Sequence, residues 1–258
     1  MPSCAAHFQF GQDVLSRLTP DIAEIVCAHK QTYDIGLQGP DIFFYYKPYR
    51  ANEISKYGKQ RHAQPASAMF TPILAHKREK AALAYLLGLV CHYALDRSCH
   101  PYVGGHSRNT AEHMAMEAAY DAHIIRRQGL SMDRHTLIPA SGPDYKAMAS
   151  LWPGMTAATV KRCVRAMRRY TRLLDHKTLL NFCEAAVHKT GAFDYMLLPD
   201  TIDERQAEYC LALDGFYEMA LHECPRLIAR AVDAMGTSGT CYDDFGLNHE
   251  GAHPNDQA

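Results

Sequence analysis

Two histidines and an aspartate at four-residue intervals form the strongest chemical signal in the sequence. His92, Asp96 and His100 stand at positions i, i+4 and i+8, so in a helix they lie on one face. A lone His–Asp pair on a helix is more often a surface hydrogen bond, but the preceding residues 81–91 are very apolar. Polar side chains buried in such a helix need partners. Imidazole and carboxylate are zinc ligands, so the pattern indicates a metal site.

Other residues could complete the ligand set of this site. His113 and Glu117 have the i, i+4 spacing of a two-point metal clamp on a second helix. Asp41 is held in a Gly-Pro-Asp turn and directly precedes an apolar, aromatic run at 42–46. Two isolated histidines, His7 and His62, are further candidates.

Helical periodicity dominates the elements that must position these residues. We expect helices at about 11–33, with a second start at Pro20, and at 66–76, 78–98, 110–127, 156–174, 176–189 and 203–235. The pair His100-Pro101 is expected to end the helix at 78–98. Gly88, one turn before His92, leaves room for another backbone or for a ligand. Residues 34–65, with several Gly and Pro, are interpreted as a long packed loop.

The chain is therefore predicted to be all-α, because no convincing period-two alternation occurs. We expect a single-domain helical bundle over residues 1–235, with a multi-zinc site between its helices beside the long Gly/Pro loop. Residues 236–258 are rich in Gly, Asn, Asp and His and are expected to form a disordered tail.

Composition limits the location and the partners. The nine scattered cysteines include no Cys-x-x-Cys pair, which favours free thiols in a reducing compartment over a disulfide framework or a zinc finger. The N-terminus has no signal-peptide pattern, and the apolar stretch at 81–91 is too short to span a bilayer. We therefore expect a cytoplasmic protein. A formal net charge of -1 gives no long-range attraction for long nucleic acids.

Three segments together resemble the zinc-dependent phospholipase C family, whose wider superfamily includes the single-strand-specific zinc nucleases. They are the run from Gly88 to Pro101, the loop at 39–46 and the run at 113–117. The resemblance extends from about His7 to Asp121. It implies a hydrolase of phosphoric ester bonds, in which metal-activated water attacks the phosphorus of a phospholipid or head-group ester.

The resemblance also implies roles for individual residues. The first zinc ion would be held by Asp41, His62, His92 and Asp96, with Asp96 bridging to another ion. The second ion would be held by His100, His113 and Glu117, and a third by His7, so two or three zinc ions are expected. Asp41 is in addition the candidate catalytic residue, which orients or deprotonates the attacking water. His76 is a rival of His62, which we prefer because its segment is irregular.

The same residues allow two alternative functions and indicate the molecules that the protein would bind. The chain could be a nuclease or nucleotidase of the wider superfamily, or a non-catalytic zinc-binding helical domain. The expected partner is a phosphate-ester small molecule or a phospholipid, the latter with peripheral membrane contact, and no protein partner is predicted. The basic stretch at 161–172 is interpreted as the solvated face of an amphipathic helix rather than as a patch for phosphate groups.

Overall fold

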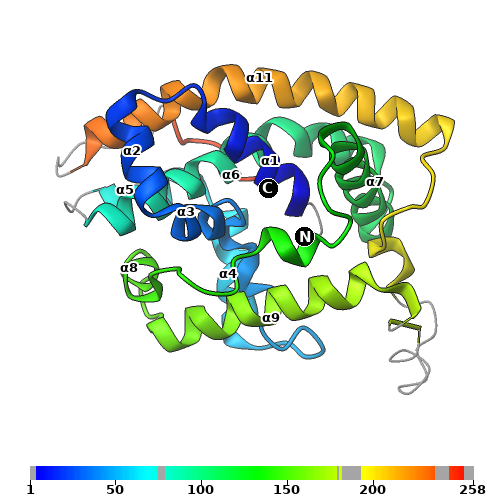
Figure 1. The fold of residues 1–258 in the computed structure, drawn as a ribbon, viewed down its shortest axis with the longest axis horizontal. Coiled ribbons are helices and arrows are strands. Elements are labelled where there is room, and N and C mark those ends of the chain that lie inside the picture. Colours follow the sequence, from blue (N-terminus) through cyan, green and yellow to red (C-terminus); the bar gives the residue numbers. More distant parts are fainter. Residues whose placement is uncertain (1–3, 75–78, 179, 182–192, 236–243, 253–258) are drawn as a thin grey trace.

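The computed structural model describes residues 4–74, 79–178, 180–181, 193–235 and 244–252. All regular elements in these segments are helices, which confirms the predicted all-α class (Figure 1). The α-helices are α1 (Cys4–Leu15), α2 (Pro20–Ala28), α3 (Lys30–Gly36), α4 (Glu53–Ala63), α5 (Ala66–Leu74), α6 (Lys80–His106), α7 (Thr110–Gln128), α8 (Tyr145–Ala149), α9 (Ala157–Asp175) and α11 (Glu204–Ala234). The 3-10 helices are η1 (Gly39–Phe43), η2 (Arg134–Leu137) and η3 (Asp194–Met196). Most of the helix predicted at 176–189 falls outside the described residues.

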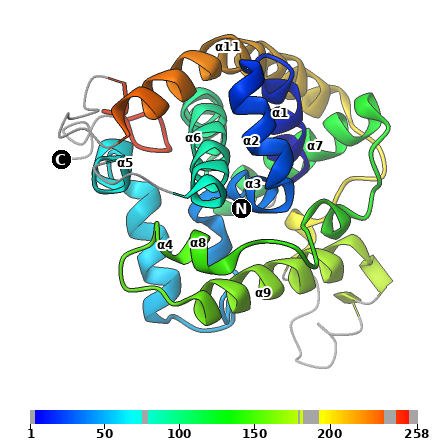
Figure 2. The same ribbon diagram turned by 60° about the vertical axis from the view of Figure 1, so that its left-hand side comes forward.

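Helix α6 is the central element of the fold (Figure 2). It packs most extensively against α11 and α3, and it also contacts α1, α7, α8 and η1. From Ala81 to Asp96 every residue of α6 is buried. A helix that is apolar all round belongs in the interior of a protein. The imidazoles and the carboxylate of α6 are therefore enclosed by other elements rather than exposed to water.

Two glycines allow α3 and α6 to cross in direct backbone contact. A Cβ atom on Gly88 would lie 2.5 Å from the carbonyl oxygen of Tyr33, and one on Gly36 would lie 2.4 Å from that of Tyr85. The expectation that Gly88 admits another backbone is therefore confirmed. The crossing places the chain that follows α3, which includes η1, beside the polar face of α6.

The prediction of a long loop at 34–65 is wrong, because most of this segment is helical. Residues 39–43 form η1, and residues 53–63 form α4. Asn52 begins α4, since its side chain accepts hydrogen bonds from the backbone N–H groups of Ile54 and Ser55. The sequence of α4 is mostly polar and contains Gly58, so it carries little of the apolar periodicity by which helices are predicted.

Helix α6 also differs from its prediction, since it continues through Pro101 to His106. A proline inside a helix lacks the N–H that would bond to the residue four positions earlier, and its ring disfavours the helix. The residues on either side of Pro101 are held by packing, because His100 and Val103 are both buried. Tertiary contact thus outweighs the local preference to stop.

Residues 244–252 are packed onto the helices, although they belong to the expected disordered tail. We call this segment the C-terminal strap. Phe245 is fully buried, and its ring lies 4.8 Å from that of Phe70 and 5.6 Å from that of Tyr93. The backbone N–H groups of Ala66 and Ser67 donate to the carbonyls of Leu247 and Phe245. The expectation is therefore wrong for the strap, and residues 236–243 and 253–258 lie outside the described part of the chain.

Helix α9 has the amphipathic arrangement favoured from the sequence. Its apolar side is buried, whereas most of its basic residues are exposed. Arg168 is half-buried and donates to the carbonyl oxygens of His135 and Ile138, which attaches α9 to η2. In the described part of the chain, no helix has the length and hydropathy needed to cross a bilayer.

Candidate metal centre

The structure brings all eight predicted site residues into one cluster. Helix α6 contributes His92, Asp96 and His100, and the other members come from α1 (His7), η1 (Asp41), α4 (His62) and α7 (His113 and Glu117). All of these side chains are buried except that of His113, which is partly exposed. His76, the rival of His62, lies outside the described residues.

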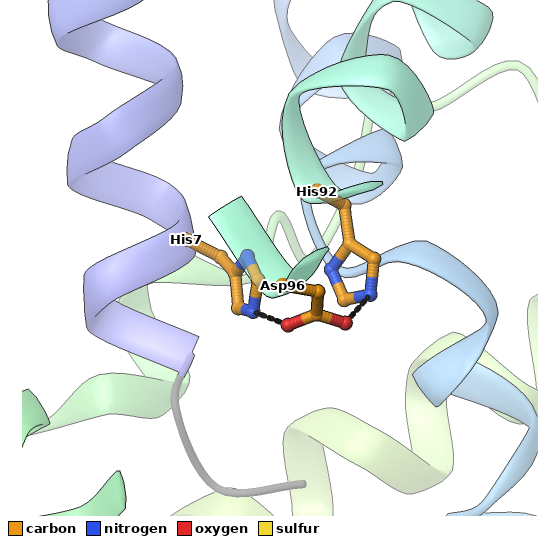
Figure 3. A group of neighbouring side chains, drawn as sticks. All are labelled: His7, His92 and Asp96. Carbon is orange, nitrogen blue, oxygen red and sulfur yellow. Dashed lines mark ion pairs between the residues drawn. The ribbon is translucent and has the colours of Figure 1, made fainter. Parts of the chain in front are cut away.

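Asp96 is the hub of the cluster. One of its carboxylate oxygens lies 3.1 Å from Nε2 of His7 and 3.6 Å from Nε2 of His100. The other lies 2.9 Å from Nε2 of His92 and 3.3 Å from Nε2 of His62. Figure 3 shows the carboxylate between His7 on α1 and His92 on α6. One buried carboxylate thus faces four imidazoles from three helices.

Glu117 is a second and smaller hub. Its Oε1 atom lies 3.2 Å from Nε2 of His100 and 3.2 Å from Nε2 of His113. His100 therefore joins the two hubs, because the same nitrogen faces both Asp96 and Glu117. The i, i+4 and i+8 spacing on α6 produces this connection directly.

Three triplets of these residues have donor atoms that all lie within 4.8 Å of one another. They are His7, His92 and Asp96; Asp41, His62 and His92; and His100, His113 and Glu117. Each is a mixed set of imidazole and carboxylate, which suits zinc. The last triplet is the set that the family resemblance gives to the second ion. The first two share His92, and Asp96, which the resemblance gives to the first ion, is grouped here with His7.

Backbone carbonyls determine the orientation of two imidazole rings. Nδ1 of His92 lies 3.1 Å from the carbonyl oxygen of Leu37, and Nδ1 of His100 lies 2.9 Å from that of His249. A carbonyl oxygen can only accept, so in both rings Nδ1 carries the hydrogen and donates. In the neutral ring Nε2 is then an acceptor, and it faces carboxylate oxygens, which are also acceptors. Such an arrangement requires a proton or a metal cation between them.

Gly39 brings Asp41 close to the His92 ring. Its φ of 55° lies in the left-handed region that favours glycine. A Cβ atom at this position would lie 2.1 Å from Cδ2 of His92. The Gly-Pro-Asp turn therefore needs glycine both for its backbone conformation and for this close approach.

The charges of the cluster change the pKa values of its members. Burial by itself raises the pKa of Asp96, but the neighbouring His100, His92 and His7 and the hydrogen bond from His62 outweigh burial and hold it well below its usual value. Burial likewise opposes ionisation of Glu117, yet hydrogen bonds from His100 and His113 lower its pKa to about 2. Both hubs are therefore negatively charged at neutral pH, as metal ligands must be.

The imidazoles respond to these carboxylates in different ways. Burial lowers the pKa of His62, but hydrogen bonds to Asp96 and Glu250 outweigh burial and raise it to about 9. Burial also lowers the pKa of His100, but the charges of Asp96 and Glu117 outweigh burial and raise it to about 10. Burial and the neighbouring His92 lower the pKa of His7.

Two residues of the strap, His249 and Glu250, reach the cluster although no site role was predicted for them. The His249 ring stacks on that of His62 at a centroid distance of 4.8 Å. A Glu250 carboxylate oxygen lies 3.2 Å from Nδ1 of His62. No helical spacing connects these residues with the predicted set, so the sequence pattern carried no signal for them.

Asp121 continues the face of His113 and Glu117 along α7 but serves another purpose. Its Oδ1 atom accepts hydrogen bonds from the backbone N–H groups of Ala5 and Ala6, at 3.1 and 2.9 Å. These N–H groups belong to the first turn of α1, where they have no partner within the helix. Asp121 therefore anchors the start of α1 and holds the adjacent His7 in place.

Comparison with known proteins is consistent with this geometry. A family model described as zinc dependent phospholipase C matches residues 6–171, a range that contains all eight predicted site residues. No curated protein and no solved structure gives a significant match. The matched range covers well over half of the chain, and the chain belongs to the zinc-dependent phospholipase C family.

Proposed function

We propose that this protein is a zinc-dependent phosphodiester hydrolase that acts on a phospholipid or on a soluble head-group ester. One observation carries the proposal: the buried Asp96 carboxylate faces imidazoles from α1, α4 and α6, while Asp41 and Glu117 stand beside them. A structural hydrogen-bond network does not need so many imidazoles around one acid. A centre that binds divalent cations does.

Unpartnered buried atoms support the fit of a cation to this cluster. Nδ1 of His7 and Oε2 of Glu117 are buried and make no hydrogen bond to any described residue. Leaving a buried polar atom without a partner costs about 1–3 kcal/mol. Coordination of an ion satisfies lone pairs of this kind without further protein partners.

We assign the ligands as the family resemblance implies. Asp41, His62, His92 and Asp96 would hold one zinc ion, His100, His113 and Glu117 a second, and His7 together with Asp96 a third. Two ions would satisfy the Asp96 and Glu117 hubs. The third ion is supported by the position of His7, whose Nε2 lies 3.1 Å from Asp96 and whose ring stacks on that of His92 at 4.2 Å.

The chemistry of the site follows from charge. Zinc, when bound, supplies positive charge that offsets the negative charge of the phosphodiester, and it lowers the pKa of water toward neutrality. Asp41 orients the attacking water and accepts its proton. The water oxygen forms a bond to phosphorus, the bond from phosphorus to the alcohol oxygen breaks with its electron pair going to that oxygen, and the oxygen takes up a proton from solvent water and leaves as the alcohol. From a phospholipid, this alcohol is diacylglycerol.

The first test of the function compares metal content with activity on three substrates. We expect at least two equivalents of zinc by elemental analysis of the purified protein. We also expect hydrolysis of a diester phospholipid and of a soluble phosphocholine ester to exceed cleavage of single-stranded DNA. Preferred cleavage of the DNA would instead establish a nuclease. Stoichiometric zinc without turnover of any substrate would establish a non-catalytic zinc-binding domain.

The second test addresses Asp41. Loss of a general acid or base typically lowers the turnover rate roughly 100- to 10,000-fold, and we expect a loss in this range for Asp41→Asn. Asp34→Asn is the matched control, because Asp34 is also a buried acid near this turn but pairs with Lys30. Equal activity of the two variants would contradict the role of Asp41.

The partner and the location remain part of the proposal. If the substrate is a phospholipid, we propose that the protein contacts the membrane surface peripherally. We propose neither a protein partner nor a long nucleic acid as partner. A cytoplasmic location is supported by the cysteines, since the seven in the described residues are all free thiols.

A further inference from the structure

The C-terminal strap, residues 244–252, passes directly over the candidate metal centre. It lies outside the range matched by the family model, which ends at residue 171. The backbone N–H of His249 approaches the carbonyl of His62 at 3.4 Å, and Nδ1 of His100 donates to the carbonyl of His249 at 2.9 Å. The strap therefore contacts two predicted ligands that come from different helices.

Both ends of the strap are firmly attached. At the start, Asp244 forms ion pairs with Arg226 and Arg230 on α11. Toward the end, Gly251 has a φ of 72°, and a Cβ atom there would lie 2.6 Å from the carbonyl oxygen of Arg97 on α6. Glycine is thus required for the strap to lie against α6 at this point.

A turn within the strap presents the Glu250 side chain. The Asn248 side-chain oxygen accepts hydrogen bonds from the backbone N–H groups of Glu250 and Ala252, at 2.9 and 3.0 Å. The Asn248 side-chain nitrogen donates to the carbonyl of Ala63 at the end of α4. This turn is therefore fixed relative to α4, the helix that carries His62.

Glu250 contacts the outer nitrogens of two imidazoles. Its Oε1 atom lies 3.2 Å from Nδ1 of His62, and its Oε2 atom lies 3.6 Å from Nδ1 of His100. The Nε2 atoms of the same rings face Asp96 and, for His100, Glu117. The carboxylate is thus on the side of each ring that faces away from the hubs.

We propose that Glu250 is a positioning residue of the metal centre, which holds His62 with Nδ1 protonated and Nε2 directed at the Asp96 hub, while the carbonyl of His249 in the same strap does this for His100. A metal-bound histidine commonly donates its other ring N–H to a carboxylate or carbonyl, which fixes its tautomer and orientation. His92 has such a partner in Leu37, and among the described residues the strap supplies one to His62. The inference rests on the proposed zinc centre.

The opposite arrangement, with Glu250 as a direct ligand, is less compatible with the contacts. The donor atoms of His62, His100 and Glu250 do lie within 4.8 Å of one another. However, a cation there would need the Nδ1 lone pair of His100, and that nitrogen already donates to the carbonyl of His249. The hydrogen-bonding pattern therefore favours the positioning role.

The experiment compares zinc binding by the full-length wild-type protein, Glu250→Ala, Glu250→Gln and the control Glu223→Gln. The Glu223 side chain is 40% exposed and that of Glu250 is 39%, but Glu223 pairs with Arg97 and Arg226 instead of imidazoles. Affinity is measured by competition with a chelator, and the number of ions by elemental analysis. Cobalt is bound in parallel, because its visible absorption reports the geometry of the ligands.

Loss of an outer partner typically weakens metal binding roughly 10- to 100-fold. We expect a loss of this size for Glu250→Ala, with the full number of ions at saturation and a shifted cobalt spectrum. Glu250→Gln, which keeps an acceptor oxygen, should recover part of the loss, and Glu223→Gln should bind as the wild type does.

Three outcomes would overturn the positioning role. They are wild-type affinity in Glu250→Ala, an equal loss in Glu223→Gln, and loss of one whole ion from Glu250→Ala, which is the behaviour of a direct ligand. The wild-type ion count separates this inference from the proposed function: zinc-loaded wild type with unaffected variants refutes only the inference, whereas a wild type that binds no zinc refutes both.

Discussion

At the scale of single residues, the main feature is one negative charge in an apolar helix. Asp96 is 2% exposed and belongs to a helix whose other buried residues are largely apolar. An isolated carboxylate would not remain ionised there, because burial disfavours the charged form. The surrounding imidazoles make ionisation favourable. The ionised carboxylate is therefore available to bind a cation.

The charge of Asp96 can be removed with little change in shape. Loss of a residue that only supports a metal ligand weakens metal binding up to roughly 100-fold. Asp96 is the proposed central ligand itself, so we expect Asp96→Asn to weaken zinc binding by at least about this factor. Chelator competition measures the affinity. Asp214→Asn is the control, because Asp214 also pairs with a histidine and an arginine, His123 and Arg127, but lies away from the cluster. Similar zinc affinities in the two variants would argue against Asp96 as the hub.

Gly39 permits a residue-scale test that leaves every predicted ligand in place. Gly39→Ala adds a methyl group that would overlap the His92 ring, in addition to the strain of about 1–2 kcal/mol that a left-handed backbone imposes on alanine. Gly154→Ala is the control, because it has a φ of 82° and no described atom within 4 Å of the new Cβ. We expect both variants to lose stability in urea, but only Gly39→Ala to lose zinc affinity. Unchanged zinc affinity in Gly39→Ala would show that His92 does not depend on this contact.

At the scale of elements, the crossing of α3 and α6 determines where the site forms. The backbones meet at Gly36 and Gly88, one turn before His92. Directly after the crossing, the carbonyl of Leu37 accepts from His92 and the chain turns into η1 with Asp41. A wider crossing would move both groups away from α6. Close helix packing is thus a condition for the metal centre.

Alanine substitutions test the closeness of this crossing. Gly36→Ala would place its methyl group 2.4 Å from the carbonyl oxygen of Tyr85, a rigid backbone atom, so we expect a loss of unfolding free energy of about 1–3 kcal/mol. Gly104→Ala in α6, the other helix of the crossing, meets no described atom within 4 Å and should add up to about 1 kcal/mol through better helix propensity. Urea unfolding measures both. Equal midpoints would show that the two helices are not in close contact.

At the scale of the whole molecule, the candidate site connects parts of the chain that are distant in sequence. Candidate ligands from α1, η1, α4, α6 and α7 converge on it, and the strap adds residues close to the C-terminus. Bound zinc would therefore link most of the fold at one point. Because an unfolded chain cannot assemble these groups, zinc binding would be coupled to folding.

Metal removal tests this coupling. At a free zinc concentration 100-fold above the dissociation constant, each ion stabilises the folded state by about 2.7 kcal/mol. We therefore expect a chelator to lower the melting temperature of the wild-type protein and added zinc to restore it. In Asp96→Asn, the same additions should produce a much smaller shift. A wild-type melting curve that is indifferent to both chelator and zinc would contradict a metal centre between the helices.

The sequence alone determined the helical class and most of the site. Side chains at four-residue intervals on one helix, such as His92, Asp96 and His100, must share a face, whatever the rest of the fold does. The same is true of His113 and Glu117. The apolar surroundings of the first set also indicated that its polar groups are buried and need partners. These conclusions depend only on local geometry and composition, which a sequence contains.

Only the tertiary structure decided which separate segments meet. Helix α4 has little apolar periodicity, and the continuation of α6 contains Pro101, so packing against other elements stabilises both. The strap is the clearest case, because Phe245 is buried between Phe70 and Tyr93, which lie far away in sequence. Its Glu250 reaches the imidazoles of α4 and α6 for the same reason. Such contacts depend on the relative placement of complete elements, and no periodicity within one segment encodes that placement.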